Sequence, residues 1–418
     1  MSISSLKKRL QKTLGLSVPA LALGSAFLVA GAPANAAEEP IRIGMTISST
    51  GSFALASQSG VRGVEVWVND VNSRGGIEIN GKKRPVELVK RDDRSDKQMV
   101  TRVYEGLITD DKVDLVFAPF GSTLTAAAAT VTDRLGKFMM IWSAASDQLY
   151  DQGFKYIVSG TQMPVSNMLN ASMAFSKQLG IKKVAIVYSD EPFPTGLAQG
   201  GRDRAQQNGI EVVMFERYPK GQKDFSTLLQ KARASGAEAF VPTSYEGDLI
   251  SMVRQMKQLN VSFPYTFMVY ASTPQFQAIG SDSNFIFSHT NYDPSINWKV
   301  NAGLNREQFA KAYDKAFPKA EFPPDFQTAL AYGAAVIAEE TIKKADSLEA
   351  GTLKQAALAL SDKLTVMAGP YAINESGMQL KMPFPVVQLQ PGKGVVTVFP
   401  QDVAVAKPDF PIPDWSKR

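Results

Sequence analysis

Short apolar runs alternate with amphipathic stretches along most of the chain, and this pattern predicts strands and helices that follow one another. In the clearest case an apolar run, residues 113–120, ends in a Gly-Ser-Thr turn and leads into a small-residue helix, residues 124–135. A second apolar run, residues 138–142, then ends in Ser-Ala-Ala-Ser. Two strands joined in this way are expected to pair in parallel, so that both carboxyl ends open at one edge of the sheet.

The same alternation occurs on both sides of this stretch. Residues 41–47 alternate as a strand, and residues 58–71 have the spacing of an amphipathic helix. A second series of helices and strands begins after Gly160 and includes apolar runs at residues 183–188 and 239–243. A chain of 418 residues is large for one hydrophobic core. We therefore expect an α/β protein with two similar lobes, each built on a doubly wound parallel sheet.

The N-terminus has the features of an export signal. A basic segment, residues 7–12, precedes a largely apolar stretch, residues 14–31, and Ala34-Asn35-Ala36 forms a small-residue cleavage site. Residues 1–36 are therefore predicted to be a signal peptide, and the mature protein is expected in the periplasm. A membrane anchor is disfavoured because Pro19 interrupts the apolar stretch and no basic stop-transfer flank follows. Because the chain has no cysteine, a lipid anchor at the cleavage point is not expected.

The amino-acid composition limits the kinds of partner and chemical site that the chain can have. The chain has 45 basic and 40 acidic residues. The predicted signal peptide contains four of the basic residues and no acidic one, so the predicted mature chain has 41 basic and 40 acidic residues. No basic cluster with interleaved aromatic residues is present, so nucleic acid is not an expected partner. The absence of cysteine excludes disulfides, cysteine-based zinc sites and cysteine nucleophiles. The one histidine, His289, is expected at the surface or at a hinge, and no nucleophile–base pair is visible. We expect no catalytic residue, metal or cofactor.

Hydroxyl side chains follow the two predicted parallel strands. Ser122 and Thr123 come after the first strand, and Ser143 and Ser146 come after the second. Ligands of open α/β sheets bind beyond these strand ends, and a helix N-terminus attracts an anion through its unpaired N–H groups and its dipole. No glycine-rich phosphate loop accompanies these residues, so the pattern favours a carboxylate. The alternative role for Ser122 and Ser146 is to cap a helix.

Aromatic and acidic residues also lie at predicted strand ends. Packing within a lobe is the expected role of Phe53, Phe120 and Phe326, whereas Trp142 suits a core and a pocket floor equally well. The Asp92-Asp93 pair is expected to brace the edge of a sheet rather than to hold a metal ion.

Four stretches of the chain carry a family resemblance. They are IRIGMTISSTGSF, NDVNSRGGIEINGKKRPVELVKRDDRS, FGSTLTAAAATVTDRLGKFMMIWSAAS and GQKDFSTLLQKARASGAEAFV. In this order they resemble periplasmic solute-binding proteins of the leucine/isoleucine/valine-binding type, which serve ABC importers. The resemblance spans nearly all of the mature chain. It implies an α/β fold with two Rossmann-like lobes and parallel sheets, joined by three crossover segments around a central cleft.

The resemblance also divides the chain into lobes. The N-terminal lobe is expected to contain residues 37–160 and 292–368, and the C-terminal lobe residues 161–291 and 369–418. The crossovers are expected near residues 159–163, 289–294 and 367–371.

In the family that the chain resembles, hydroxyl and backbone groups of the first lobe hold the solute carboxylate. Those positions match Ser122, Ala144 and Ser146, in agreement with the pattern of hydroxyls at the strand ends. Aromatic positions of the second lobe match Phe193 and Tyr245. The predicted ligand-binding residues are Ser122, Thr123, Ala144, Ser146, Phe193, Tyr245 and Tyr270.

In amino-acid binders of this type, an acidic residue after a later strand pairs with the ammonium group of the ligand. The matching position in this chain is Tyr270 or Ala271, and neither residue is acidic. Glu246, Asp248 or Asp147 is one way to fill this role, because a desolvated ammonium group needs a nearby carboxylate. The alternative is a solute without an ammonium group, which is a branched acid, an aromatic acid or an amide.

The resemblance implies that the protein captures a small carboxylate-bearing solute by lobe closure and delivers it to an inner-membrane ABC permease. The solute is expected to be a branched-chain or hydrophobic amino acid, or a related branched or aromatic acid, and the protein is expected to be a monomer. One alternative is a periplasmic receptor of the same fold that feeds a chemoreceptor or regulator. A further alternative, an exported hydrolase, is disfavoured by the presence of only one histidine.

Overall fold

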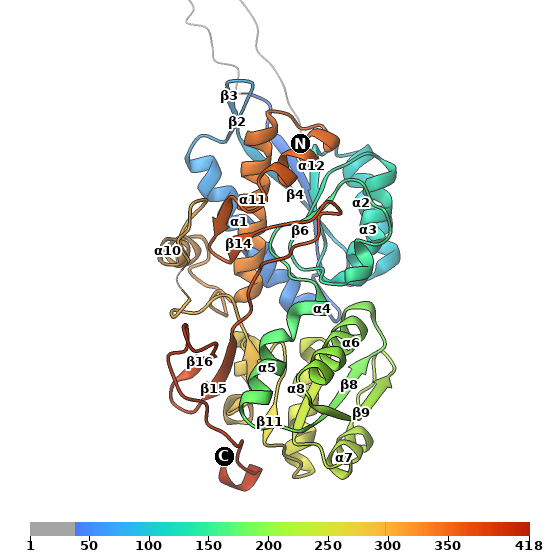
Figure 1. Ribbon diagram of the computed structural model, residues 1–418. Helices are drawn as coiled ribbons and strands as arrows, with labels where there is room; N and C mark the ends of the chain where they lie inside the picture. The colour runs from blue at the N-terminus through green and yellow to red at the C-terminus, as the bar shows by residue number, and fades with distance from the viewer. Residues whose placement is uncertain (1–37, 297) are drawn as a thin grey trace, which may run out of the picture. The chain divides into compact units, whose positions relative to one another are not determined.

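The structure is a computed structural model that describes residues 38–296 and 298–418 (Figure 1). The predicted signal peptide, residues 1–36, lies outside the described residues. None of the helices in the described part of the chain is both long enough and apolar enough to cross a membrane.

The first sheet has five strands, all parallel, in the order β4-β1-β5-β6-β7. Because β1 lies between β4 and β5, the direction of winding reverses there, and the carboxyl ends of β1 and β5 form the switch point of the sheet. Ligands of open α/β sheets bind at such a point. The strands are β1 (Ile41–Ile47), β4 (Val86–Asp92), β5 (Leu115–Phe117), β6 (Met139–Ile141) and β7 (Ile157–Ser159).

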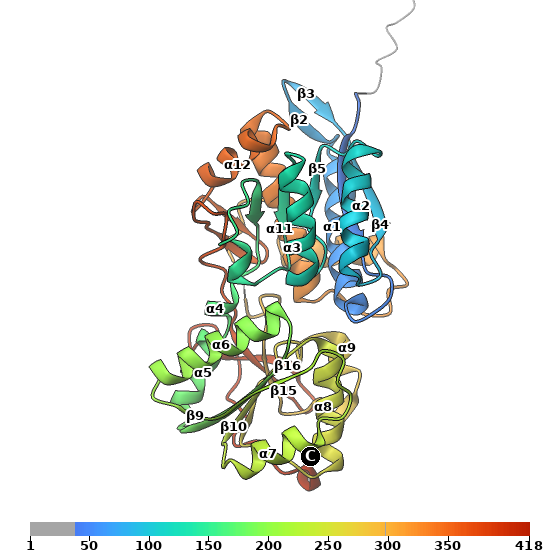
Figure 2. The ribbon, with the colours of Figure 1, turned by 90° about the vertical axis from the view of Figure 1, so that its right-hand side faces the viewer.

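Helices cover both faces of the first sheet. Right-handed crossovers place α1 on one face and α2 and α3 on the other. In agreement, α1 packs against α11 and α2 packs against α3, and Figure 2 shows these helices gathered around the sheet. The helices are α1 (Ala54–Ser73), α2 (Lys97–Thr109), α3 (Ser122–Arg134), α10 (Arg306–Ala316), α11 (Phe326–Ala345) and α12 (Ala350–Ala359), and a hairpin of β2 (Ile77–Ile79) and β3 (Lys82–Arg84) follows α1.

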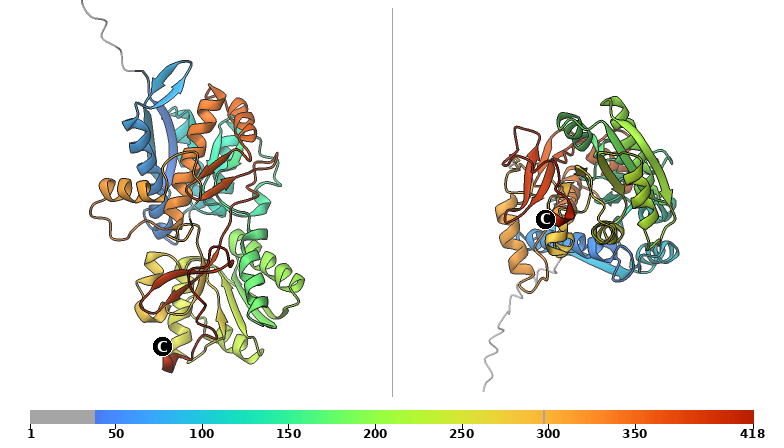
Figure 3. Two further views of the ribbon diagram at one scale, coloured as in Figure 1. Left: turned by 60° about the vertical axis from the view of Figure 1, so that its left-hand side comes forward. Right: turned by 90° about the horizontal axis from the view of Figure 1, so that it is seen from below.

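A second parallel sheet has four strands in the order β11-β10-β8-β9. A three-stranded antiparallel sheet, β12-β15-β16, continues from it through a parallel bridge between Phe267 and Phe287. Figure 3 shows that β15 and β16, in dark red, group with these elements although they come last in the chain. The strands are β8 (Lys183–Ser189), β9 (Glu211–Tyr218), β10 (Ala239–Thr243), β11 (Tyr265–Thr266), β12 (Phe287–His289), β15 (Val386–Gln390) and β16 (Gly394–Phe399).

Helices again alternate with the strands of this second lobe, so the predicted pair of α/β lobes with parallel sheets is confirmed. One helix predicted after Gly160 is divided at Leu169 into α4 and α5. The helices are α4 (Val165–Met168), α5 (Asn170–Gln178), α6 (Pro192–Gln207), α7 (Ser226–Ala234), α8 (Glu246–Gln258) and α9 (Pro274–Gln277), with short 3-10 turns at η1 (Asp147–Leu149), η2 (Gly280–Ser283) and η3 (Trp415–Lys417).

Contacts of residues 364–379 indicate where the chain makes its third crossover between the lobes. β13 (Leu364–Val366) and β14 (Gly369–Tyr371) form a hairpin. Beyond it, the Gly377 carbonyl accepts a hydrogen bond from the N–H of Ser159, and the Gln379 side chain donates to the carbonyl of Gly160. We propose that the third crossover lies near residues 382–385, just before β15, which is later in the chain than the family resemblance implies.

Glycine residues allow α1 and α11 to approach closely. A Cβ atom at Gly63 of α1 would lie 2.2 Å from the carbonyl oxygen of Thr328 in α11. One turn earlier, the Ser59 hydroxyl donates to Asp325, the N-cap of α11, at 2.6 Å. This contact fixes the start of α11, where Phe326 is located.

We expect Gly63→Ala to destabilise the fold by about 3 kcal/mol, because the added methyl group forces the two helices apart. The measurement is chemical unfolding of the purified variant. The matched control is Gly106→Ala in α2, where the nearest atom to the new Cβ is Asp110 Oδ2 at 3.7 Å. With that space, replacing a helical glycine is expected to stabilise the protein by about 1 kcal/mol. Equal effects of the two substitutions would contradict the close approach.

Candidate functional site

Two loops that follow β5 and β6 are joined by hydrogen bonds, and we call them the serine loops (residues 121–123 and 143–146). The Ser122 hydroxyl accepts from the N–H groups of Ala145, at 3.2 Å, and Ser146, at 3.1 Å. In return, the Ser143 hydroxyl accepts from the N–H of Gly121 at 3.1 Å. The sequence therefore placed these hydroxyl groups together correctly. Ser122 does not cap α3, because it is the first residue of that helix and its hydroxyl bonds to the neighbouring loop.

Backbone conformation explains why the first serine loop contains glycine. Gly121 has a φ of +79°, in the left-handed region that other residues adopt only with strain. A Cβ atom there would also lie 3.5 Å from the hydroxyl oxygen of Tyr245, which comes from the second lobe. The Tyr245 hydroxyl is therefore held next to the turn that begins α3.

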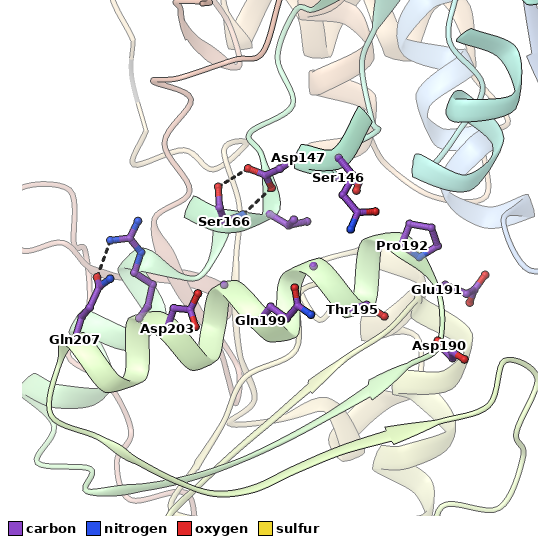
Figure 4. Close-up of a pocket in the computed structure, with 15 residues that line it drawn as sticks. Ser146, Asp147, Ser166, Asp190, Glu191, Pro192, Thr195, Gln199, Asp203 and Gln207 are labelled. Atoms are coloured by element: carbon purple, nitrogen blue, oxygen red, sulfur yellow. Dashed lines mark hydrogen bonds between the residues drawn. The ribbon is translucent and has the colours of Figure 1, made fainter. Parts of the chain in front are cut away.

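The other predicted residues of the first lobe lie in or beside the serine loops. Ala144 is fully buried between Ser143 and the backbone that Ser122 binds. The Thr123 hydroxyl is buried and has no hydrogen-bond partner among residues 38–296 and 298–418. Ser146 lines an open groove of about 560 Å³ between its own loop and α6 (Figure 4).

Aromatic rings from both lobes meet next to the serine loops and form an aromatic cluster. The Tyr245 ring lies 4.8 Å from the ring of Phe53 and 5.5 Å from that of Phe193. Tyr270 continues the cluster at 6.5 Å from Phe193 and 6.1 Å from Phe326. All of its members are at most 6% exposed. The aromatic cluster consists of Phe53, Phe120, Phe193, Tyr245, Tyr270 and Phe326.

The sequence analysis assigned Phe53, Phe120 and Phe326 to packing within a lobe, but the structure places them in contact with second-lobe rings. A signal was present for Phe120, because it directly precedes the Gly-Ser-Thr turn. Tyr270 also differs from expectation. The sequence pattern predicts a strand over residues 265–270, but β11 ends at Thr266. Tyr270 instead lies in a turn, where its carbonyl accepts a hydrogen bond from the N–H of Thr273.

Tyrosine hydroxyl groups in the cluster stay protonated. Burial raises the pKa of the Tyr245 phenol well above its usual value, and burial likewise raises the pKa of Tyr270. Both hydroxyls can therefore donate hydrogen bonds. The Tyr245 oxygen has no partner within the described part of the chain, which is rare for a buried polar atom and is typical of ligand sites.

Two spaces adjoin the aromatic cluster. One, of about 170 Å³, lies against Phe120, Tyr245 and Tyr270 and has one acidic residue in its wall, Glu246. The other, of about 20 Å³, is also lined by Tyr270 and contains His289 in its wall. His289 is only 3% exposed, so it does not lie at the surface, and its place at a hinge stays a prediction. It is the last residue of β12, a strand that the sequence pattern did not reveal.

Acidic residues elsewhere have structural partners. Asp93 accepts hydrogen bonds from Thr46 and Ser48, which confirms that it braces the edge of the first sheet. Asp147 accepts from the Ser166 hydroxyl and N–H at the start of α4 (Figure 4). Among the described residues, no group of three or more histidine and acidic side chains could hold a metal ion.

Comparison with known proteins agrees with this geometry. Residues 40–394 match the family model described as periplasmic binding protein. A relative from Brucella suis biovar 1, named Leu/Ile/Val-binding protein homolog 7, is 26% identical over 409 residues, which cover 94% of this chain and 98% of the relative.

Solved structures share the fold. The branched-chain amino acid transporter substrate-binding protein LivJ of Streptococcus pneumoniae, in complex with isoleucine, aligns with a TM-score of 0.72 at 22% identity, over 86% of this chain and 100% of LivJ. An ABC transporter solute-binding protein of R. palustris, in complex with benzoate, aligns with a TM-score of 0.73 at 17% identity, over 86% of this chain and 95% of the R. palustris chain. With a family model matched over most of its length, this chain belongs to the periplasmic binding protein family, in the type that includes the Leu/Ile/Val-binding proteins.

Proposed function

We propose that this protein captures a small carboxylate-bearing solute in the periplasm and delivers it, as a monomer, to the permease of an ABC importer. The solute is a branched-chain or hydrophobic amino acid, or a related branched or aromatic acid. One observation carries the proposal: the serine loops, at the carboxyl ends of β5 and β6, face an aromatic cluster to which both lobes contribute.

The serine loops have the chemistry to hold a carboxylate. The first N–H groups of α3 have no partner within the helix, and the helix dipole places partial positive charge at that end. Ser122 begins α3, and its hydrogen bond holds the N–H of Ser146 beside it. Tyr245 adds a neutral hydroxyl donor from the second lobe. A carboxylate at this point meets backbone, serine and tyrosine donors together.

The aromatic cluster suits the remainder of such a solute. Its rings supply an apolar surface, and the adjoining space of about 170 Å³ is large enough for a small aliphatic or aromatic group. Because Phe53 and Tyr245 belong to different lobes and touch directly, ligand contacts made by both lobes favour the closed arrangement.

Relatives differ in whether the ligand carries an ammonium group. The LivJ structure contains isoleucine, which has one, and the R. palustris structure contains benzoate, which has none. In this chain, Asp147 is bonded to Ser166, and Asp248 accepts from Ser244 at 2.8 Å and from Tyr218 at 3.1 Å. These two carboxylates are already occupied by structural donors.

Glu246 is the acid best placed to pair with an ammonium group. It is 6% exposed, lines the space of about 170 Å³, and accepts a hydrogen bond from the Thr273 hydroxyl. Burial, with a smaller contribution from the charge of Asp325, raises the pKa of its carboxyl to about 7. A ligand ammonium supplies the positive charge that this buried carboxylate needs in order to ionise.

We expect Ser122→Ala to weaken the binding of any carboxylate solute by about tenfold or more, because one buried hydrogen-bonding group is lost. Isothermal titration with a panel of amino acids, branched acids and aromatic acids measures the affinity. The control is Ser281→Ala, since Ser281 is exposed in η2. Unchanged affinity in the double variant Ser122→Ala/Ser146→Ala would sink the carboxylate model.

The role of Glu246 is tested with paired ligands, L-leucine and 4-methylpentanoate, which differ only in the ammonium group. We expect Glu246→Gln to weaken the binding of L-leucine by about tenfold or more while leaving 4-methylpentanoate unaffected. Glu307→Gln is the matched control, because Glu307 also lies in the first turn of a helix but is exposed. An equal loss for both ligands would assign Glu246 a structural role only.

Titration of Glu246 also predicts how stability depends on pH. The folded state holds the Glu246 proton more tightly than the unfolded state does. The contribution of Glu246 to the free energy of unfolding therefore falls as the pH rises from about 4.5 to about 7. Glu246→Gln is therefore expected to leave stability unchanged near pH 4.5 and to raise it by up to about 3 kcal/mol at pH 8. Thermal unfolding at the two pH values measures this difference. Glu307→Gln should give no gain at pH 8, and a similar gain there would contradict the assignment.

A further inference from the structure

A small polar cavity lies beside the aromatic cluster, away from Glu246. Its volume is about 20 Å³, which is room for roughly one water molecule or one hydroxyl group. Tyr270 separates it from the larger space, since this residue lines both. The polar side chains in its wall are Ser143, Gln162, Tyr270, His289 and Gln327.

Two of these side chains have buried atoms with unmet hydrogen-bonding capacity. His289 Nδ1 and Gln327 Oε1 find no partner among the residues that the structure describes. His289 is only 3% exposed and Gln327 only 4%, so bulk solvent does not supply hydrogen bonds to these two atoms. Buried polar atoms without partners are rare in folded proteins, and two in the wall of one cavity point to a polar group that binds there.

His289 is held in a fixed orientation by aromatic rings. Its ring stacks on Phe384 at 4.4 Å and meets the edges of Phe326 at 5.8 Å and Phe267 at 5.9 Å. Burial lowers the pKa of its imidazole to about 3, so the ring is neutral at physiological pH. A neutral imidazole has one nitrogen that donates and one that accepts.

Gln327 is also fixed in place. It is the second residue of α11, and the preceding N-cap, Asp325, accepts from the N–H of Thr328 at 2.9 Å. This cap sets the direction of the first helical turn, which places the Gln327 carboxamide in the wall of the cavity. Neither polar group therefore depends on a mobile loop for its position.

We propose that His289 and Gln327, together with the Tyr270 hydroxyl, bind a neutral, hydroxyl-sized polar group at the far end of the solute. This inference rests on the proposed function, because it assumes that the carboxylate lies at the serine loops. A hydroxyl group matches the site, since it can donate to Gln327 Oε1 and accept from an imidazole N–H. A second carboxylate is too large for this cavity, and the apolar rings around His289 disfavour a charged group such as an ammonium.

The position of the cavity agrees with a solute that spans the cleft. Ser143 lines the cavity, and its hydroxyl accepts from the N–H of Gly121, so the cavity begins close to the serine loops. Phe193 and Tyr270 line it on the side of the aromatic cluster. The solute class that follows is a carboxylic acid whose hydrophobic body, ring or branched chain, bears a hydroxyl group.

Matched ligand pairs test this proposal with the full chain. We would measure dissociation constants by isothermal titration for benzoate and 4-hydroxybenzoate, for 3-phenylpropanoate and 3-(4-hydroxyphenyl)propanoate, and for L-phenylalanine and L-tyrosine. In at least one pair, the hydroxylated member is expected to bind about tenfold tighter, which is the effect of one satisfied buried hydrogen bond.

Substitutions then show which residues cause the preference for the hydroxylated ligand. Gln327→Leu and His289→Phe are each expected to reduce it to less than about threefold, and His289→Phe keeps the stacking on Phe384. Gln178→Leu is the matched control, because Gln178 is exposed at the end of α5, and it should retain the full preference. Thermal unfolding of each variant shows that a lost preference is not lost folding.

Three results would overturn the inference. If the parent acids bind as tightly as their hydroxylated partners, the cavity holds only water and the proposed function stands. If the preference persists in both Gln327→Leu and His289→Phe, the hydroxyl group binds elsewhere. If no carboxylate in the panel binds at all, the proposed function itself fails together with this inference.

Discussion

The pair of hydrogen bonds accepted by the Ser122 hydroxyl is the interaction on which the rest of the site depends. It satisfies the N–H groups of Ala145 and Ser146, which are buried and lie outside any strand. Leaving two such groups unpaired costs about 1–3 kcal/mol each. Because one hydroxyl binds both groups, the loop after β6 cannot move without the start of α3. The predicted anion site therefore has a fixed shape before any ligand arrives.

The aromatic cluster couples this fixed site to the second lobe. Tyr245 contacts Phe53 of the first lobe and Phe193 of its own, and burial of such rings is favourable by several kcal/mol at ~25 cal/mol per Å². The closed arrangement also buries the hydroxyls of Thr123 and Tyr245 without partners in the described chain, which opposes closure. A solute that bonds to these hydroxyls removes that cost. Ligand contacts and lobe closure are thus linked through the same few atoms.

The sequence predicted those parts of the site whose residues lie close together along the chain. The serine loops were predictable because strand, turn and helix follow one another within about forty residues, and parallel crossovers leave little freedom. Phe326 and His289 were not, because each comes from a distant segment whose place in the cleft depends on tertiary packing. Glu246 was one of three acids that the sequence left equivalent. Only burial and the hydrogen bonds of the other two distinguish it.

The tyrosine at position 270 gives a physical reason for the two spaces beside the aromatic cluster. A tyrosine ring fills volume that a carboxylate leaves open, and here it separates a space lined by Glu246 from one lined by His289. The wall of the first space contains one acidic side chain, whereas the polar side chains in the wall of the second are neutral. Tyr270 lies in a turn that follows β11, a strand of only two residues. In the proposed function, the first lobe thus recognises a feature common to many solutes, while the turn that holds Tyr270 determines which solute fits.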